Sequence, residues 1–393
     1  MDRPTVAITG IGVVGPCGVG ADAFWDGLLR APTESGDRRS VGDWDPSPWY
    51  ETNKEARRAD KFTQFAVAAA AMALDEAGSF DADPARIGVH IGTGVGGIGT
   101  NEEQIIVNHT KGSRRVSPFL VPMMMSNAAA AAVSMRYGFE GPCETTVTAC
   151  AAGTHSIGNA ARLIESGRCD VVIAGGSESA QTPTSMAGFG NMTALSSSGI
   201  SMPFDQRRDG FVMGEGAGVL VLEELGRAQA RGATIHGLLL GSASTADAHH
   251  ITAPSPGGVG AVRCMELAIA DAGLSAADVV HVNAHGTSTP LNDAAEAEAM
   301  AKVFGAPGPI VTSTKGVTGH ALGAAGALEA VAVVLAMRNR VIPPTMGLEQ
   351  LDPELPSLDY VVDEPRAWEP GPSLSNSFGF GGHNGTIVIA PGA

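Results

Sequence analysis

Cys150 is the residue of this chain whose type and position most clearly point to chemistry. A β-branched run at 145–148 ends directly before it, and a helix-compatible stretch of small residues follows. This pattern predicts a strand-to-helix elbow with Cys150 at the start of the helix. Unpaired N–H groups and the positive end of the helix dipole at such a place lower the pKa of a thiol and favour the nucleophilic thiolate. A single cysteine is more often a small buried hydrophobe, so its neighbours must decide.

Two histidines are candidate partners for that thiol. His285 follows a predicted strand at 279–283 within the polar sequence NAHGTSTP, and His320 lies in a second Gly/Thr-rich loop, at an elbow that we predict to be equivalent to that of Cys150. In doubly wound α/β folds, ligands bind beyond the carboxyl ends of the strands. One histidine in such a loop is usually a structural hydrogen-bonding group, whereas two beside a cysteine elbow indicate a catalytic site.

Composition excludes several other classes of protein. The net charge of −16 argues against nucleic acid as a partner. Five cysteines without a CxxC pair predict neither disulfides nor a metal site and fit a reducing cytoplasm. The glycine run at 93–99 matches no nucleotide-binding motif, and we expect no cofactor. The apolar runs at 127–135 and 321–337 are interpreted as too short or too broken to span a membrane.

The elements that must position these residues form an internal repeat. Residues 211–222 and 378–389 align in register, and the strand, elbow and small-residue helix around Cys150 recur at 312–330. We therefore predict two similar α/β halves, residues 1–230 with the cysteine and 231–393 with both histidines, whose sheets pack through buried helices rich in Gly and Ala. The predicted strands are 5–14, 86–92, 170–175, 211–223, 235–243, 279–283, 310–312 and 377–390, and the predicted helices are 21–29, 61–77, 127–137, 260–272 and 319–337.

The motifs around these residues resemble those of one known family. Cys150 lies in TACAAG, His285 in NAHGTSTP, Lys315 and His320 in TKGVTGH, and NSFGFGG ends at Gly382; SPF at 117–119 and RRDGF at 207–211 continue the match in one register. Together they resemble the elongating, Cys-His-His type of β-ketoacyl-acyl carrier protein synthase. The resemblance implies a thiolase-like fold, a layered α-β-α-β-α sandwich, normally found as a dimer.

The resemblance also implies a role for each motif residue. Cys150 would be the covalent nucleophile. His285 and His320 would stabilise the charge left when a malonyl thioester loses CO2. Lys315 and Glu329 would organise the histidines, a role compatible with a buried ion pair that supports the fold. The N–H groups of Cys150 and Phe380 would form an oxyanion hole, and the flexible loop formed by Phe378, Gly379, Phe380, Gly381 and Gly382 would form a gate. His383 departs from the family's usual Thr.

Two further groups match surfaces of that family. Lys54, Arg57, Arg58, Arg207 and Arg208 match its docking surface for acyl carrier protein, although charge clusters are often only solvated surface. Val95, Met123, Met124 and Met125 match its acyl tunnel, which reaches the dimer interface. Plain interface packing is the alternative for these methionines.

The pathway and the partner subunit stay open at this point. One reading is fatty-acid synthesis by a homodimer, and the other is a type II polyketide or polyene pathway with a chain-length-factor-like subunit. His383, the three methionines and the short polar segment at 38–50 favour the second. A non-catalytic partner subunit would typically lack Cys150. A degradative thiolase would need a second cysteine at 378–385, where there is none, and an initiating synthase would have Asn in place of His320.

Overall fold

The computed structural model describes residues 3–32 and 35–392, so the outer limits of the predicted halves, residues 1 and 393, lie outside the described residues. Each half contributes five main strands. The first set is β1 (Val6–Gly15), β4 (Ile87–Gly92), β5 (Cys143–Glu144), β6 (Val171–Glu178) and β8 (Gly216–Glu224). The second set is β9 (Gly237–Ala246), β10 (His281–Asn283), β11 (Ile310–Thr312), β15 (Ser373–Gly379) and β16 (His383–Pro391).

The two sets have the same topology. From the centre outward the orders are β1-β8-β6-β4-β5 and β9-β16-β15-β10-β11, with β13 (Asp359–Tyr360) beyond β11. In both sets the inner pairs are antiparallel and the outer pairs are parallel. A short antiparallel pairing of β1 with β9 joins them into one mixed sheet. The predicted duplication is therefore confirmed, and the sets touch along an edge as well as through helices.

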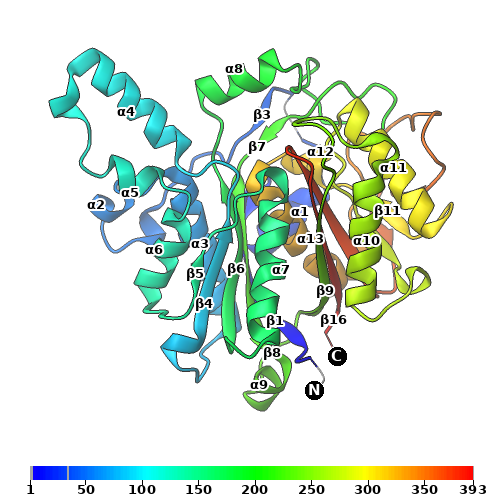
Figure 1. Ribbon diagram of the computed structural model, residues 1–393, viewed down its shortest axis with the longest axis horizontal. Coiled ribbons are helices and arrows are strands. Elements are labelled where there is room, and N and C mark those ends of the chain that lie inside the picture. Colours follow the sequence, from blue (N-terminus) through cyan, green and yellow to red (C-terminus); the bar gives the residue numbers. More distant parts are fainter. Residues whose placement is uncertain (1–2, 33–34, 393) are drawn as a thin grey trace.

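Five layers result from the helices that cover these sheets (Figure 1). α7 (Ala152–Glu165) and α13 (Ala325–Asn339) pack between the two strand sets. α3 (Lys61–Ala77) and α6 (Ala128–Tyr137) cover the first set, and α10 (Val259–Asp271) and α11 (Pro290–Phe304) cover the second. This is the predicted α-β-α-β-α sandwich. The division at residue 230 stays a prediction, because α7 and α13 are shared by both sets.

Helix α13 shows why the central layer is rich in small residues. A Cβ added at Gly218 of β8 would lie 2.5 Å from the carbonyl oxygen of Ala327, so the helix backbone packs directly on the strand. Contrary to the sequence expectation, the segment from Leu322 to Asn339 is long and apolar enough to span a membrane. It is almost wholly buried between the two strand sets, and a helix that is apolar all round is typical of such a core position.

Two helical segments stand away from this core (Figure 1). α4 (Ile98–Lys111) and α5 (Leu120–Met124) form an arm on one side, and α8 (Pro183–Asn191) lies over the end of the sheets. The arm exposes large apolar side chains, among them Ile105, Ile106 and Val121, each more than half exposed. An exposed apolar surface of this kind is typical of an interface with another protein.

The remaining elements are short, and two predictions need correction. The residues at 145–148 have no regular structure, and the expected strand there is reduced to β5; the closing segment is a hairpin of β15 and β16 instead of one strand.

The other short elements are β2 (Gly18–Val19), α1 (Ala21–Leu28), β3 (Arg38–Arg39), α2 (Asn53–Ala56), β7 (Met213–Gly214), α9 (Leu225–Ala230), α12 (Lys315–Thr318), β12 (Val341–Ile342) and β14 (Arg366–Ala367).

Candidate active site

Cys150 lies at an elbow, as predicted, although a 3-10 turn precedes the helix. Ala149 has a left-handed backbone (φ 49°), the turn Ala149–Ala151 follows, and α7 begins at Ala152. The second half repeats this geometry at Leu322 (φ 44°), the turn Leu322–Ala324 and α13. The structural equivalent of Cys150 is therefore Gly323. The prediction that His320 is that equivalent is wrong, because His320 precedes the elbow.

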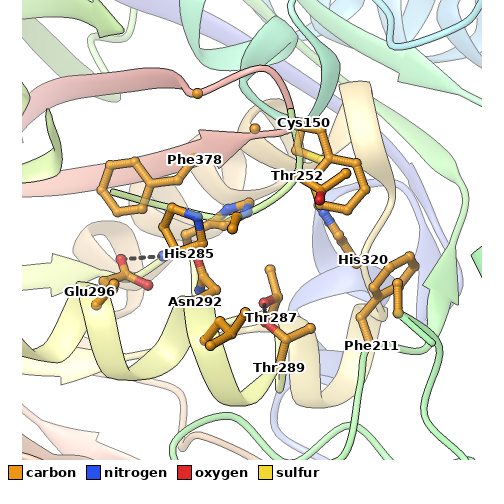
Figure 2. A pocket seen from close by; sticks show the side chains of 18 of the residues that line it. Cys150, Phe211, Thr252, His285, Thr287, Thr289, Asn292, Glu296, His320 and Phe378 are labelled. Carbon is orange, nitrogen blue, oxygen red and sulfur yellow. Dashed lines mark hydrogen bonds between the residues drawn. The ribbon is translucent and has the colours of Figure 1, made fainter. Parts of the chain in front are cut away.

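A cavity of about 520 Å³ brings the predicted chemistry together. Cys150, His285, His320 and the gate residues Phe378, Gly379 and Phe380 all line it. Figure 2 shows the thiol and the two imidazoles facing this space from separate elements. All three side chains are buried, with 6% or less of each residue exposed.

The two histidines form one packed unit. Their ring centroids lie 5.1 Å apart at 86°, with Phe211 edge-on to His320 at 5.3 Å and Phe378 near His285 at 5.9 Å. The backbone of His320 is held by β7, because its N–H donates to Val212 (2.7 Å) and its carbonyl accepts from Gly214 (2.9 Å). This packing fixes both rings in orientation.

Lys315 sets the tautomer of His285. Its Nζ donates to the carbonyl oxygen of His285 (2.6 Å), lies 3.3 Å from Nδ1 of the same residue, and forms a buried ion pair with Glu329. An ammonium has only donors, so Nδ1 accepts and the proton of the neutral ring resides on Nε2. Burial lowers the pKa of His285, with the charge of Lys315 and the neighbouring His320 adding to it; burial and then Lys315 also lower the pKa of His320. Both rings are therefore neutral N–H donors at neutral pH.

The thiol of Cys150 differs from the sequence expectation. Burial raises its pKa to about 12, although the charge of Lys315 and the backbone N–H of Phe380 act in the opposite direction. The helix start alone does not outweigh the loss of water around a fully buried sulfur. In this buried position the group is a neutral thiol, so its proton must leave during the attack on a substrate.

Glycines in the gate loop allow this loop to pack closely against Cys150. A Cβ added at Gly379 would lie 3.1 Å from the backbone nitrogen of Cys150, so this close approach needs glycine. Gly381 and Gly382 have φ values of 84° and 74°, which glycine adopts without strain. The N–H of Gly381 donates to Ile251 (2.7 Å), and the ring of Phe380 lies 6.4 Å from that of Phe189 on α8. The loop is thus closed over the thiol.

Sequence reasoning missed a buried glutamate in this site. Glu296 of α11 accepts the N–H groups of His285 (2.7 Å) and Gly286 (2.8 Å), a contact drawn in Figure 2, and thereby fixes the loop that carries the catalytic histidine. The only signal was an acidic residue on a helix that follows the NAHGTSTP motif. Phe211 and Phe189 were also missed, because their contacts join segments distant in the chain.

The predicted docking residues divide into two sets. Lys54 lies in α2, Arg57 ends that helix, and Arg58 stacks on Phe119 at 4.2 Å. Arg207 is paired with Asp205 but keeps 43% of its side chain exposed. Arg208 is a correction: its side chain is 7% exposed and pairs with Asp352 at 2.6 Å, so its charge is not free to meet a partner.

The predicted tunnel residues do not line the cavity at Cys150. Val95, Met124 and Met125 are partly exposed, and Met123 and Met125 instead line a second cavity of about 560 Å³ together with Lys54 and Arg58. In the single chain, therefore, two groups that were assigned separately lie side by side, on the surface that the arm helices also form.

Comparisons with known proteins agree with this geometry. Residues 30–228 match the model of the N-terminal domain of β-ketoacyl synthases, and residues 236–349 match that of the C-terminal domain. The 3-oxoacyl-[acyl-carrier-protein] synthase 2 of Synechocystis sp. is 44% identical over 413 residues, which cover 99% of this chain and 98% of the relative. Two solved structures, the ishigamide ketosynthase/chain length factor and the AntDE:AntF complex, each share 31% identity over 100% of both chains, with TM-scores of 0.93 and 0.91.

The site and the fold define a condensing enzyme, an acyltransferase whose cavity holds a cysteine and a histidine pair. The chain belongs to the β-ketoacyl synthase family.

Proposed function

We propose that this synthase elongates acyl groups carried on acyl carrier protein, with Cys150 as the acyl acceptor and malonyl thioester as the extender. The observation that carries the proposal is the neutral pair His285 and His320, which faces the buried thiol in one cavity, with the tautomer of His285 set by Lys315. The 3-oxoacyl-[acyl-carrier-protein] synthase name of its relative supports the same substrate class.

The first half-reaction is acyl transfer. The sulfur of Cys150 attacks the thioester carbonyl, and the N–H groups of Cys150 and Phe380 stabilise the oxyanion. When the tetrahedral intermediate collapses, the carrier thiolate leaves and takes up the proton that the Cys150 thiol has lost. Charge is thereby conserved within a cavity that excludes water.

The second half-reaction is decarboxylative condensation. The carboxyl-bearing C–C bond of the malonyl group breaks, CO2 leaves, and the N–H donors of His285 and His320 hold the enolate oxygen. The enolate carbon then attacks the acyl group on Cys150, forming the new C–C bond. The Cys150 thiolate leaves and is reprotonated, which restores the resting enzyme.

The docking surface of this proposal consists of Lys54, Arg57, Arg58 and Arg207. Acidic carrier protein needs a local positive patch on a chain of net charge −16, and Lys54, Arg57 and Arg58 are exposed on and beside α2. Arg207 pairs with Asp205 and Glu349, so it would contribute to the patch through its exposed part alone. The AntDE:AntF structure is described as an acyl-carrier protein in complex with its ketosynthase. Val95 and the three methionines would belong to the far end of the acyl tunnel once a second subunit covers the arm.

The second subunit is either a copy of this chain or a chain-length-factor-like partner. Exposed apolar residues on the arm and the uncovered edge of β5 fit both. The 44% identity to a 3-oxoacyl-[acyl-carrier-protein] synthase 2 favours a fatty-acid homodimer. His383 and the match to the ishigamide ketosynthase/chain length factor favour a type II polyketide or polyene pathway as the second candidate. We place either enzyme in the cytoplasm.

Separating the two half-reactions tests this mechanism. Cys150→Ala removes the acyl acceptor, so condensation is expected to fall to background. Cys150→Gln places a neutral amide beside the histidines and is expected to release CO2 from malonyl carrier protein without condensing it. The measurement is CO2 release alongside 3-oxoacyl product. Full condensation by Cys150→Ala would contradict the mechanism.

A further inference from the structure

Glu178 is a buried carboxylate that the mechanism above does not use. It ends β6 and has no exposed surface. Its Oε2 accepts the backbone N–H groups of Gly94 (2.6 Å) and Gly323 (3.1 Å), and its Oε1 accepts the hydroxyl of Thr93 (3.1 Å). The N–H of Val95 also faces it. These partners are all neutral donors. The buried acid, whose desolvation is unfavourable, is therefore held by backbone N–H groups and one hydroxyl.

The duplication shows what this carboxylate replaces. Glu178 pairs with Gly216 across β6 and β8, and Gly379 pairs with His383 across β15 and β16. Because residues 211–222 align with 378–389, Glu178 and Gly379 are equivalent positions, just as Gly323 is equivalent to Cys150. In the catalytic half Gly379 has no side chain, and its backbone packs closely on the backbone nitrogen of Cys150. In the other half the carboxylate of Glu178 accepts the Gly323 N–H.

The two segments that Glu178 joins both lead to the surroundings of Cys150. Gly323 follows Leu322, which lines the catalytic cavity. The 93–97 loop leads into Ile98, which packs on the apolar cluster that contains Cys150, Met186 and Leu322. The fit is tight, since a Cβ added at Gly323 would lie 2.1 Å from the nitrogen of Gly94. One carboxylate therefore joins the segment of Leu322, which lines the cavity, to a loop that leads into the apolar cluster around Cys150.

We propose that Glu178 is a positioning residue that clamps the 93–97 loop to the start of α13 and thereby sets the acyl-chain-length selectivity at Cys150. The inference rests on the proposed acyl transfer to that cysteine. With the clamp intact, Leu322 presents a fixed apolar wall to the acyl chain, and Ile98 packs on the cluster that supports this wall. Without this clamp the wall is more mobile, and longer acyl chains are excluded less strictly.

The test is the acyl-length profile of Glu178→Gln. Burial raises the pKa of Glu178 to about 7, so the profile is measured well above that pH, where the carboxylate is charged. The substitution then keeps the shape but turns a charged acceptor of four donors into an amide with one oxygen. The ratio of kcat/KM between the preferred acyl-carrier substrate and a markedly longer one is expected to shrink roughly fivefold, the size of one weakened charge-assisted hydrogen bond. Hydrogen exchange at the amides of residues 94–98 is expected to quicken in the same variant.

Two further variants make the outcome decisive. Glu215→Gln is the matched control, because Glu215 is also buried and accepts from Val41, Lys61 and Ser179 without lining the catalytic cavity; its length profile is expected to match that of the wild type. Thr93→Val removes one donor to Glu178 and is expected to shift the profile in the same direction if Glu178→Gln folds poorly.

An active Glu178→Gln enzyme with an unchanged profile, or with all acyl lengths slowed by one common factor, overturns this inference alone. A wild-type protein that takes up no acyl group on Cys150 overturns the proposed function and this inference together.

Discussion

At the scale of single residues, protonation decides what this site does. Cys150 is a neutral thiol because the effect of burial on its pKa outweighs that of the helix start. Burial also lowers the pKa of His285 and of His320, so both rings are neutral. A neutral imidazole whose other nitrogen accepts from Lys315 directs one N–H toward the substrate oxygen. The buried ion pair of Lys315 and Glu329 thus orients a donor instead of taking part in the reaction itself.

The pH profile of decarboxylation tests that protonation state. Lowered pKa values keep both histidines neutral as pH falls through 6.5, where an ordinary histidine becomes charged. We expect CO2 release by Cys150→Gln, per enzyme bound to saturating malonyl carrier protein, to stay level from pH 8 to below 6.5. If CO2 release instead fell by half near pH 6.5, the two histidines would titrate as exposed imidazoles do.

What the sequence allowed at this scale was the choice of candidate reacting residues. The elbow at Cys150 and the loops of both histidines were found from residue type and local spacing. The pKa direction of the thiol was not predicted correctly, because burial depends on packing between distant segments. Glu178 was missed because it binds backbone N–H groups far along the chain. Glu296 was missed because no local motif marks its contact with the loop of His285.

At the scale of elements, α2 and the residue that ends it carry the clearest candidates for carrier docking. Helix α2, which carries Lys54 and ends at Arg57, lies next to the arm in Figure 1, and Arg58 stacks on Phe119. The charge of Arg208, by contrast, is neutralised by an internal pair with Asp352. Sequence clustering could not separate these cases, since adjacent arginines differ only in what the fold places beside them.

Charge reversal at α2 tests the docking surface. The double substitution Arg57→Glu and Arg58→Glu is expected to raise KM for acyl carrier protein roughly tenfold, because steering and contact with an acidic partner are lost, with little change in kcat. Small thioester mimics need no docking and should keep their KM. Arg263→Glu, an exposed reversal on α10 at the other side of the molecule, is the matched control. An equal loss with mimic and carrier substrate would remove the docking role.

At the scale of the whole molecule, the duplication explains both the symmetry and its breaking. Two equivalent elbows lie in one central layer, yet only one carries a cysteine, with Gly379 packed against it, while the N–H of the other is bound by the carboxylate of Glu178. The repeat and the layers followed from sequence patterns. The pairing of β1 with β9 and the true equivalence of Gly323 required the three-dimensional register.

The fold also carries a buried histidine that makes stability depend on pH. His281 of β10 is 1% exposed, its ring nitrogens have no hydrogen-bond partner among the described residues, and the ring packs edge-on to Trp368 at 5.4 Å. Burial lowers its pKa to about 3. The unfolded chain therefore binds this proton near pH 6.5 and the folded chain does not, so the stability that the neutral ring contributes is lost progressively as pH falls from 6.5 toward 3.

Urea unfolding at pH 7.5 and 5.5 measures this effect. Between these two pH values, the free energy of unfolding is expected to fall by about 1.4 kcal/mol more in the wild type than in His281→Leu. This difference is the contribution of one such histidine. An identical pH dependence in both proteins would mean that the folded state protonates His281 readily.

The central claim, that Cys150 is the acyl acceptor of an elongating synthase, is tested most directly by intact-protein mass spectrometry after incubation with acyl carrier proteins of differing chain length. We predict a mass increase of one acyl group per chain, mapped to Cys150, lost in Cys150→Ala and reversed when malonyl carrier protein is added. An enzyme that condenses substrate while Cys150 stays unmodified, or an acyl group found equally in Cys150→Ala, would contradict it.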